Sequence, residues 1–338
     1  MYQATRELRA APGRTALITV TVGLIAVMVT FLSALAAGLG HRSTSALDEL
    51  LGPDDAVIVA DSGAPSLAAS RLTPEQVREA RPSDVAGGAG GAAAIWSVGR
   101  ARVGDQPVFV FPDASLRADE VRMPAGLGGT DVDGPGSVTL DGRTVTVAGA
   151  AGDIWWEHQP VVLAAPDLAD RIAGAPSAIV VDESRTAVPE VAGTVVKRGD
   201  ERADLSASNA GEQMSLGAMT ALLFVISALV VGAFFMVWTV QRMRGVAVSS
   251  ALGASRSVLA ADSLGQAAIV LAAGVGAGTA ITVGAGTWLA SADVMPVVVD
   301  AATTLWPGLL LAATGLIGAA AAMVPVLRVE PREALANA

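Results

Sequence analysis

Side chains able to act as nucleophiles, proton donors or metal ligands are few in this chain. Its 338 residues include two histidines, His41 and His158, and no cysteine. The absence of cysteine excludes a disulfide framework, a thiolate metal site and a cysteine nucleophile. A serine–histidine–aspartate set can be assembled on paper, but no spacing or motif supports it. We therefore predict no catalytic residues and no enzymatic activity in the chain itself.

The most unusual local cluster is Trp155-Trp156-Glu157-His158. Exposed, its rings and imidazole would suit an apolar ligand or haem. However, two tryptophans just before a strand are more often part of a hydrophobic core. The core interpretation is preferred, and the ligand-binding interpretation stays open.

The elements that must position these side chains include four long uncharged stretches. The chain is 52% hydrophobic and 16% charged, against about 25% charged in a typical soluble domain. Each stretch can cross a hydrocarbon core of roughly 30 Å at 1.5 Å per residue, and none shows the polar stripe of a soluble helix. We predict transmembrane helices at residues 15–39, 216–240, 264–289 and 306–327.

The arginines predict the orientation of these helices. Outside residues 41–214, all eight basic residues lie before the first span, between the second and third, or after the fourth. Basic flanks stay in the cytoplasm. The cytoplasmic parts are therefore an amphipathic N-terminal segment (1–14), a loop (241–263) and the C-terminus (328–338). The chain would be a multi-pass plasma-membrane protein, although a cleaved signal peptide is the alternative for the first span.

On the outer side we expect a domain at residues 40–215 and a short loop at residues 290–305. Residues 41–214 hold 26 acidic and 14 basic residues, so this domain would repel phosphates and is not expected to bind nucleic acid. Asp141-Gly142 between two apolar alternating segments predicts a β-hairpin. Further strands are expected at 55–60, 107–112, 161–164 and 178–182, with helices from Pro74 and over 167–172. The predicted fold class is membrane α-helical, with four transmembrane helices and an inserted mixed α/β extracytoplasmic domain.

The third span is rich in glycine. Gly274 and Gly278 are four residues apart and therefore share one helix face. Small residues let helices approach closely in lipid, where membrane lipid surrounds the remaining faces. We predict a helix–helix contact at this face, with its partner left open.

The segment after the second span resembles a family signature. Residues 242–255 read Arg-Met-Arg-Gly-Val-Ala-Val-Ser-Ser-Ala-Leu-Gly-Ala-Ser, which is similar to the Arg-x-Arg-Glu-Ile-Ala-Val-Leu-Lys-Ala-Leu-Gly-Ala-Ser run of FtsX/MacB-type ABC transporter permeases. Gly245 stands where the family has an acidic residue, and Ser249-Ser250 replace Leu-Lys. The proline-containing close at residues 324–335 and the order of one span, outer domain and three spans also resemble the family.

Within this family, the chain looks most like haem-exporter-like permeases of high-GC Gram-positive bacteria. The stretches that carry this likeness are residues 5–9, 38–40, 158–162 and 226–235. The resemblance implies a homodimer bound to two copies of a separate ABC ATPase. It also implies mechanical coupling through the 241–263 loop by Arg242, Arg244, Ala251, Leu252, Gly253, Ala254 and Ser255.

The sequence agrees that another subunit must hydrolyse ATP. It has no Gly-x-x-x-x-Gly-Lys-Ser/Thr phosphate loop, and its one lysine, Lys197, lies in another context. We expect no intrinsic cofactor, with ATP used through the partner and haem as a possible substrate.

Three residues that flank the outer ends of the first two spans are candidate substrate ligands: His41, Glu212 and Met214. Imidazole, carboxylate and thioether groups can all ligate haem iron or a soft metal. Alternatively, His41 and Glu212 are ordinary solvated residues. At the level of function, the alternatives are an FtsX-like regulator that controls an extracellular cell-wall hydrolase and, more weakly, a membrane-anchored hydrolase.

Overall fold

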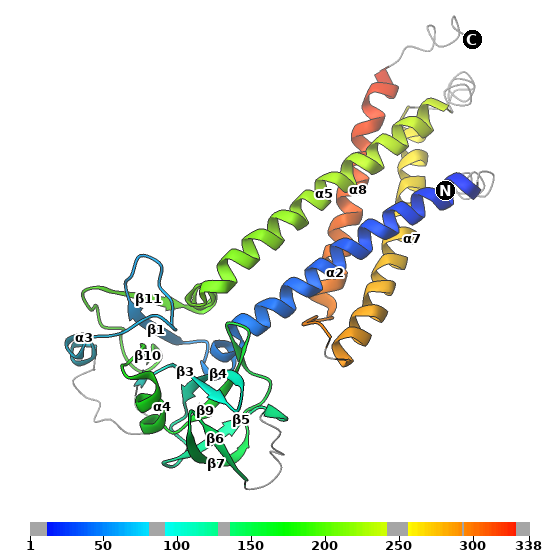
Figure 1. Ribbon diagram of the computed structural model, residues 1–338. Coiled ribbons are helices and arrows are strands. Elements are labelled where there is room, and N and C mark those ends of the chain that lie inside the picture. Colours follow the sequence, from blue (N-terminus) through cyan, green and yellow to red (C-terminus); the bar gives the residue numbers. More distant parts are fainter. Residues whose placement is uncertain (1–11, 81–91, 128–135, 242–255, 293, 329–338) are drawn as a thin grey trace, which may run out of the picture. The chain divides into compact units, whose positions relative to one another are not determined.

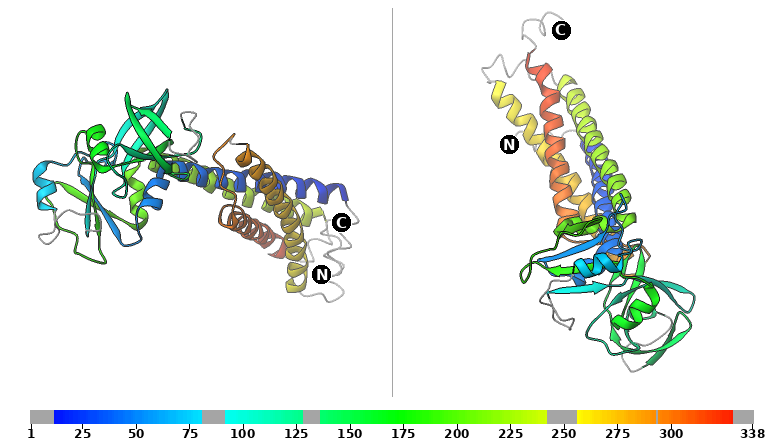
Figure 2. Two further views of the ribbon diagram at one scale, coloured as in Figure 1. Left: turned by 90° about the horizontal axis from the view of Figure 1, so that it is seen from below. Right: turned by 90° about the vertical axis from the view of Figure 1, so that its left-hand side faces the viewer.

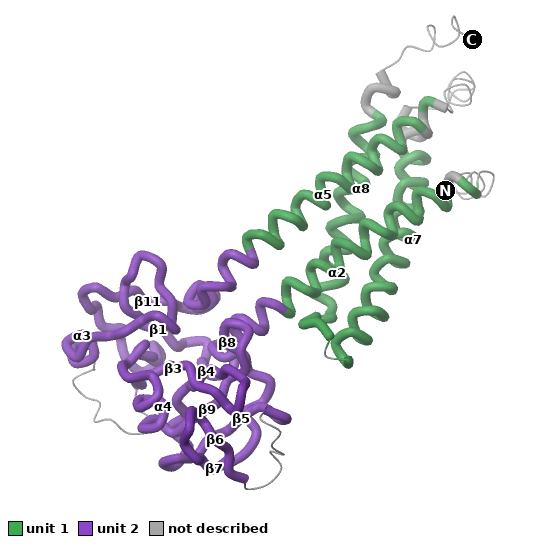
Figure 3. The backbone as a smooth tube through the Cα atoms, viewed as in Figure 1, with its two compact units in different colours: residues 1–38, 214–338 green, residues 39–213 purple. Residues whose placement is uncertain are grey.

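The computed structural model describes residues 12–80, 92–127, 136–241, 256–292 and 294–328. The chain divides into two compact units, one formed by residues 1–38 with 214–338 and the other by residues 39–213 (Figure 3). Each unit is built around its own buried side chains.

The first unit is helical (Figure 1). Four helices of the described chain are long and apolar enough to cross a membrane, which confirms the predicted number of spans. Their outward faces expose large apolar side chains such as Leu24, Leu229 and Leu309, as expected where lipid is the solvent. The helices are α2 (Pro12–Leu50), α5 (Ala207–Gln241), α7 (Arg256–Ser291) and α8 (Ala301–Arg328).

Glycines bring α7 and α2 into close contact. A methyl group added at Gly278 would lie 2.5 Å from the carbonyl oxygen of Gly23 and 2.6 Å from Cβ of Ala26. One at Gly274 would lie 2.9 Å from the carbonyl oxygen of Thr19. Only glycine permits this approach, which in lipid gains van der Waals contact along the two backbones.

A buried hydrogen bond fixes the register of the same two helices. Thr30 Oγ1 of α2 donates to Thr282 Oγ1 of α7 over 2.7 Å, and both residues are at most 1% exposed. Helices α5 and α8 also pack closely at glycines, since a methyl group at Gly232 would lie 2.9 Å from the carbonyl oxygen of Gly318. The apolar core between the helices includes Val22, Val231, Phe235, Leu271 and Leu311.

The second unit contains a four-stranded antiparallel sheet in the order β11-β1-β10-β2. Its strand β1 is buried on both faces, because Val57 and Val59 join one apolar cluster and Ile58 joins another. The short helix α3 (Pro74–Glu79) starts at a capping box formed by Thr73 and Gln76. The strands are β1 (Asp55–Ala60), β2 (Ala93–Trp96), β10 (Ala178–Asp182) and β11 (Thr194–Arg198), and a 3₁₀ helix, η2 (Gly199–Leu205), follows.

The other sheet of this unit closes into a barrel. Its order is β4-β3-β6-β7-β5-β9-β8, and β4 also pairs with β9, so six strands form a ring (Figure 2). The helix α4 (Pro166–Ala173) contributes Leu168 and Ala169 to the barrel's apolar interior. The strands are β3 (Gly99–Val103), β4 (Gln106–Pro112), β5 (Glu120–Met123), β6 (Gly136–Leu140), β7 (Arg143–Ala150), β8 (Trp155–Trp156) and β9 (Gln159–Ala164).

Aromatic rings link the barrel to the four-stranded sheet. Phe111 lies edge-on to Trp96 at a centroid distance of 5.8 Å and to Trp156 at 6.0 Å. Trp156 is fully buried in this cluster, as the core interpretation expects, whereas Trp155 is only half-buried and does not belong to the core. Four membrane-type helices with a β-rich mixed domain inserted between the first and second confirm the predicted fold class.

Candidate functional site

The hairpin turn between β8 and β9 has an unusual backbone. Glu157 and His158 form the two-residue turn, and both have left-handed backbone angles, with φ of 47° and 63°. Two-residue turns of this kind normally use Asn-Gly, because a Cβ atom strains the left-handed conformation. Contacts around the turn must therefore hold Glu157 and His158 in place.

Helix α2 supplies the first of these contacts. The amide of Glu157 donates to the carbonyl oxygen of Ser43 over 3.2 Å, and that of His158 donates to the carbonyl oxygen of Arg42 over 2.9 Å. One turn further along α2, the Ser45 hydroxyl accepts from the Trp155 amide at 2.8 Å. The Arg42 guanidinium lies 4.7 Å from the centroid of the Trp155 ring. The hairpin is therefore fastened to α2 along residues 42–45.

The His158 ring joins this turn to α5. Its Nε2 lies 2.8 Å from Oε1 of Glu212 and 3.2 Å from the hydroxyl of Ser43, and that hydroxyl also donates to Oε2 of Glu212 at 3.4 Å. Ser43 is fully buried, while the His158 and Glu212 side chains are about one-third exposed. We call Ser43, His158 and Glu212 the clasp.

The clasp does not have the geometry of a hydrolytic triad. In a triad, the serine and the acid contact opposite nitrogens of the imidazole, so that the acid orients the ring. Here Ser43 and Glu212 both contact Nε2 of His158. The clasp can bridge three elements and can present a carboxylate and an imidazole to a ligand, but it does not activate Ser43 as a nucleophile.

The three candidate ligands predicted from sequence have different surroundings. His41 pairs with Asp153, with 3.6 Å between Nε2 and Oδ2, and its side chain is 45% exposed. Glu212 lies in the clasp. Met214 lies on α5 with 78% of its surface exposed and belongs to the helical unit.

Sequence reasoning missed the partnership of Glu212 with His158 and Ser43. His158 drew attention only as part of the tryptophan-containing cluster. Nothing in the spacing of residues 43, 158 and 212 signals that they meet, because the strand pairings between them bring them together.

The predicted coupling residues Arg242, Arg244 and Ala251–Ser255 lie outside the described residues. The helix-packing candidates Gly274 and Gly278 lie against α2, as described above.

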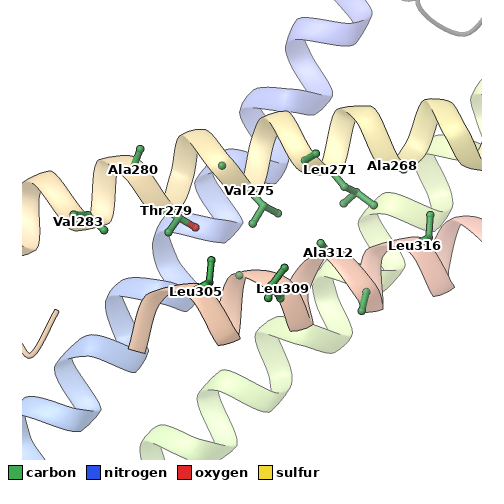
Figure 4. A pocket seen from close by; sticks show the side chains of 14 residues that line it. Ala268, Leu271, Val275, Thr279, Ala280, Val283, Leu305, Leu309, Ala312 and Leu316 are labelled. Atoms are coloured by element: carbon green, nitrogen blue, oxygen red, sulfur yellow. The ribbon is translucent and has the colours of Figure 1, made fainter. Parts of the chain in front are cut away.

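A separate apolar groove runs between α7 and α8 in the helical unit (Figure 4). It has a volume of about 770 Å³, and its walls include Leu271, Val275 and Leu309. Thr279 is the one polar side chain among the residues that line it. A groove with this lining suits apolar chains and offers almost no polar recognition.

The helical unit resembles a known class of membrane protein. Residues 217–331, which include most of α5 and all of α7 and α8, match the family described as "FtsX-like permease C-terminal". This match and the four long apolar helices together indicate a multi-pass membrane protein whose C-terminal part is similar to FtsX-like permeases.

Similarity to individual proteins extends over the inserted domain as well. The chain is 24% identical to a Staphylococcus haemolyticus protein described as "Putative hemin transport system permease protein HrtB", over 99% of both chains. It is 22% identical over 99% of both chains, and 23% identical over 75% and 76% of them, to proteins of the same description from two Staphylococcus epidermidis strains. For two of these relatives, the similarity therefore covers nearly the whole chain, including the residues of the inserted domain.

Proposed function

We propose that this chain is the permease subunit of an ATP-driven exporter that moves haem, or a similar amphipathic molecule, out of the membrane or cell. The observation that carries the proposal is the similarity to hemin transport permeases over 99% of the chain. The FtsX-like domain at residues 217–331 supports the same class.

A separate ABC ATPase would supply the energy. The chain has no phosphate loop of its own, so nucleotide binding falls to a partner. We propose two ATPase copies on a homodimer of this chain, with residues 241–263 receiving their movement. The basic flanks support a cytoplasmic position for this loop and both termini, with the inserted domain outside.

Substrate binding is proposed at the outer ends of α2 and α5. Glu212 would offer a carboxylate to haem iron, with His41 and Met214 as further candidate ligands. A carboxylate that already accepts a hydrogen bond from an imidazole is oriented and can remain a ligand, since such outer partners commonly position metal ligands. His158, at 2.8 Å from Glu212, fits that orienting role.

A haem titration of the detergent-purified chain tests these ligands. The absorption spectrum of bound haem should change in Glu212→Ala and in His41→Ala, because each removes a group that can approach the iron. Unchanged spectra in both variants would remove these two residues from the proposal.

ATPase activity of the complex tests the proposed export. Haem should stimulate ATP hydrolysis when this chain and its ATPase are reconstituted together in lipid. A regulator of a cell-wall hydrolase would instead bind a hydrolase partner through residues 40–215 and show no haem-dependent rate. Such a result would replace the export proposal with the regulatory one.

A further inference from the structure

A cleft in the second unit lies directly beside the Glu157–His158 turn. It has a volume of about 600 Å³, and Glu157 forms part of its wall. The residues used below also line it: Ala68, Arg71, Arg100, Phe109 and Ile172. We call it the arginine cleft.

The charge of this cleft is opposite to that of the domain around it. Two arginines and one glutamate line it, whereas acidic residues greatly outnumber basic ones over residues 41–214. A positive hollow in an acidic surface concentrates anions at that one place.

Arg100 is held at two points. Its Nη2 lies 3.0 Å from Oε2 of Glu157, and its guanidinium carbon lies 5.0 Å from the centroid of the Phe109 ring. The Arg100 side chain is 65% exposed, whereas that of Glu157 is 12% exposed. A ligand can therefore reach the arginine directly from solvent and compete with Glu157 for it.

Arg71 lies elsewhere in the cleft wall, and only one of its three guanidinium nitrogens is used in hydrogen bonds within the described residues. Its Nη1 donates to the carbonyl oxygens of Ala68 and Ser70, over 3.0 Å and 2.6 Å. Within the described part of the chain, its Nε and Nη2 donate to no protein group. An arginine fork with free nitrogens is suited to a carboxylate.

We propose that the arginine cleft binds an amphipathic carboxylate, which takes Arg100 from Glu157 and so loosens the turn from α2 and α5. Arg71 and Arg100 bind the acid groups, and Ala68 and Ile172 line the space for the apolar part of the ligand. Any amphipathic carboxylate would do, so the cleft is a second site that does not depend on iron ligation at Glu212.

The link to the helices follows from the position of Glu157. A nearly buried carboxylate that loses its only ion-pair partner in the described structure is costly to keep in place. It moves toward water, and its left-handed backbone is free to relax. The hydrogen bonds that the amides of Glu157 and His158 donate to the carbonyl oxygens of Ser43 and Arg42 then break. The contact of His158 with Glu212 in the clasp is lost as well.

Binding of metal-free protoporphyrin IX to the full-length purified chain tests the cleft. This probe carries two carboxylates and no iron, so it reports nothing about haem-iron ligands, and its dimethyl ester serves as the uncharged control. We expect the acid to bind at least tenfold more weakly to Arg100→Gln and to Arg71→Gln, and several-fold more tightly to Glu157→Gln, which frees Arg100. Binding of the ester should be the same in all of them.

The matched control is Arg102→Gln. Arg102 lies two residues from Arg100 on the exposed side of β3, bonds to the carbonyl oxygen of Asp105 and does not line the cleft. It should bind the probe as the unchanged chain does. Arg100→Lys keeps an ion pair for Glu157 and guards against misfolding. Equal affinities of the Arg100→Gln, Arg100→Lys and Arg102→Gln variants for protoporphyrin IX would contradict the proposed site. Weaker binding of protoporphyrin IX by Glu157→Gln than by the unchanged chain would contradict it as well.

Hydrogen exchange at the amides of Glu157 and His158 tests the coupling. Both amides are hydrogen-bonded to α2, so saturating probe should speed their exchange in the unchanged chain. In Arg100→Gln, where Glu157 has already lost its ion-pair partner, exchange should be fast without the probe and should not change when the probe is added. Exchange that stays slow in the liganded unchanged chain would overturn the coupling.

Discussion

At the scale of single residues, the left-handed turn at Glu157 and His158 is the most demanding feature of the second unit. Neither residue is glycine, yet φ is 47° and 63°. The strain is offset by the hydrogen bonds that the two amides donate to α2, by the ion pair between Arg100 and Glu157, and by the clasp. The turn therefore depends on side chains far away in the sequence.

Substitutions at His158 separate the backbone requirement from the side-chain contacts. His158→Val should destabilise the chain by about 1–2 kcal/mol more than His158→Asn, because a branched Cβ is disfavoured in the left-handed region whereas asparagine is tolerated there. Both variants lose the ring contact with Glu212. Thermal unfolding of the purified chain measures the difference, and equal stability of the two would contradict it.

Sequence reasoning correctly predicted the hairpin turn whose own residue types favour a left-handed backbone. Asp141-Gly142 predicted a hairpin, and both residues have left-handed backbones between β6 and β7. Glu157-His158 carries no such signal, because the backbone of that turn is stabilised by α2, α5 and β3. The clasp and the arginine cleft could not be predicted for the same reason.

At the scale of elements, the α2–α7 contact depends on glycine at defined positions. Gly278→Ala should destabilise the helical unit by about 1–3 kcal/mol, because its methyl group would overlap Gly23 and Ala26 of α2. Gly276→Ala, on the same helix with nothing within 4 Å, should be neutral or slightly stabilising. Thermal stability in detergent compares the pair, and a larger loss in Gly276→Ala would contradict the packing described.

The start of α8 depends on Asp300. Its Oδ1 accepts from the Thr303 amide at 2.7 Å, and this bond, with that of the Thr303 side chain, lowers the pKa of Asp300 below its ordinary value. The cap is therefore fully formed above the ordinary aspartate pKa and is lost as pH falls through the lowered one.

Asp300→Ala should accordingly lower the melting temperature at neutral pH, and the gap to the unchanged chain should shrink in acid. Asp300→Asn retains a capping oxygen and should lose less at neutral pH. Melting curves at several pH values measure both effects. A gap that widens in acid would show that the cap does not involve the charged carboxylate.

Apart from the hairpin of β6 and β7, the strands that sequence analysis predicted have a continuous apolar pattern. β1, β4, β9 and β10 were expected, and each contains at least three consecutive buried residues. The missed strands are short or mixed in character: β8 has two residues, β3 alternates with arginine, and β11 has no fully buried residue. The closure of the barrel by β4 and β9 is a long-range pairing that no local pattern indicates.

At the scale of the whole molecule, the four spans were predictable because lipid imposes both length and composition on a helix. The arginine flanks predict an orientation that the helices by themselves do not reveal. The chain's lack of cysteine makes this orientation simple to test.

A single cysteine at Ser62, an exposed residue of the second unit, should react with a membrane-impermeant maleimide in intact cells. A single cysteine added after Ala338 should react only after the cells are opened, because the C-terminus is predicted to be cytoplasmic. Labelling of the C-terminal cysteine in intact cells would reverse the orientation, and with it the external position of the clasp and the arginine cleft.

The order of strands in the four-stranded sheet has a consequence for biosynthesis. β1 lies between β10 and β11, so it cannot pair until the ribosome has made β10, whose Asp182 lies opposite Asp55. At about 5–20 residues per second, the interval is roughly 6–25 s. Throughout it, a strand made of Val57, Ile58 and Val59 has neither neighbour, so the nascent domain is most open to aggregation and to proteases while the barrel is still being made.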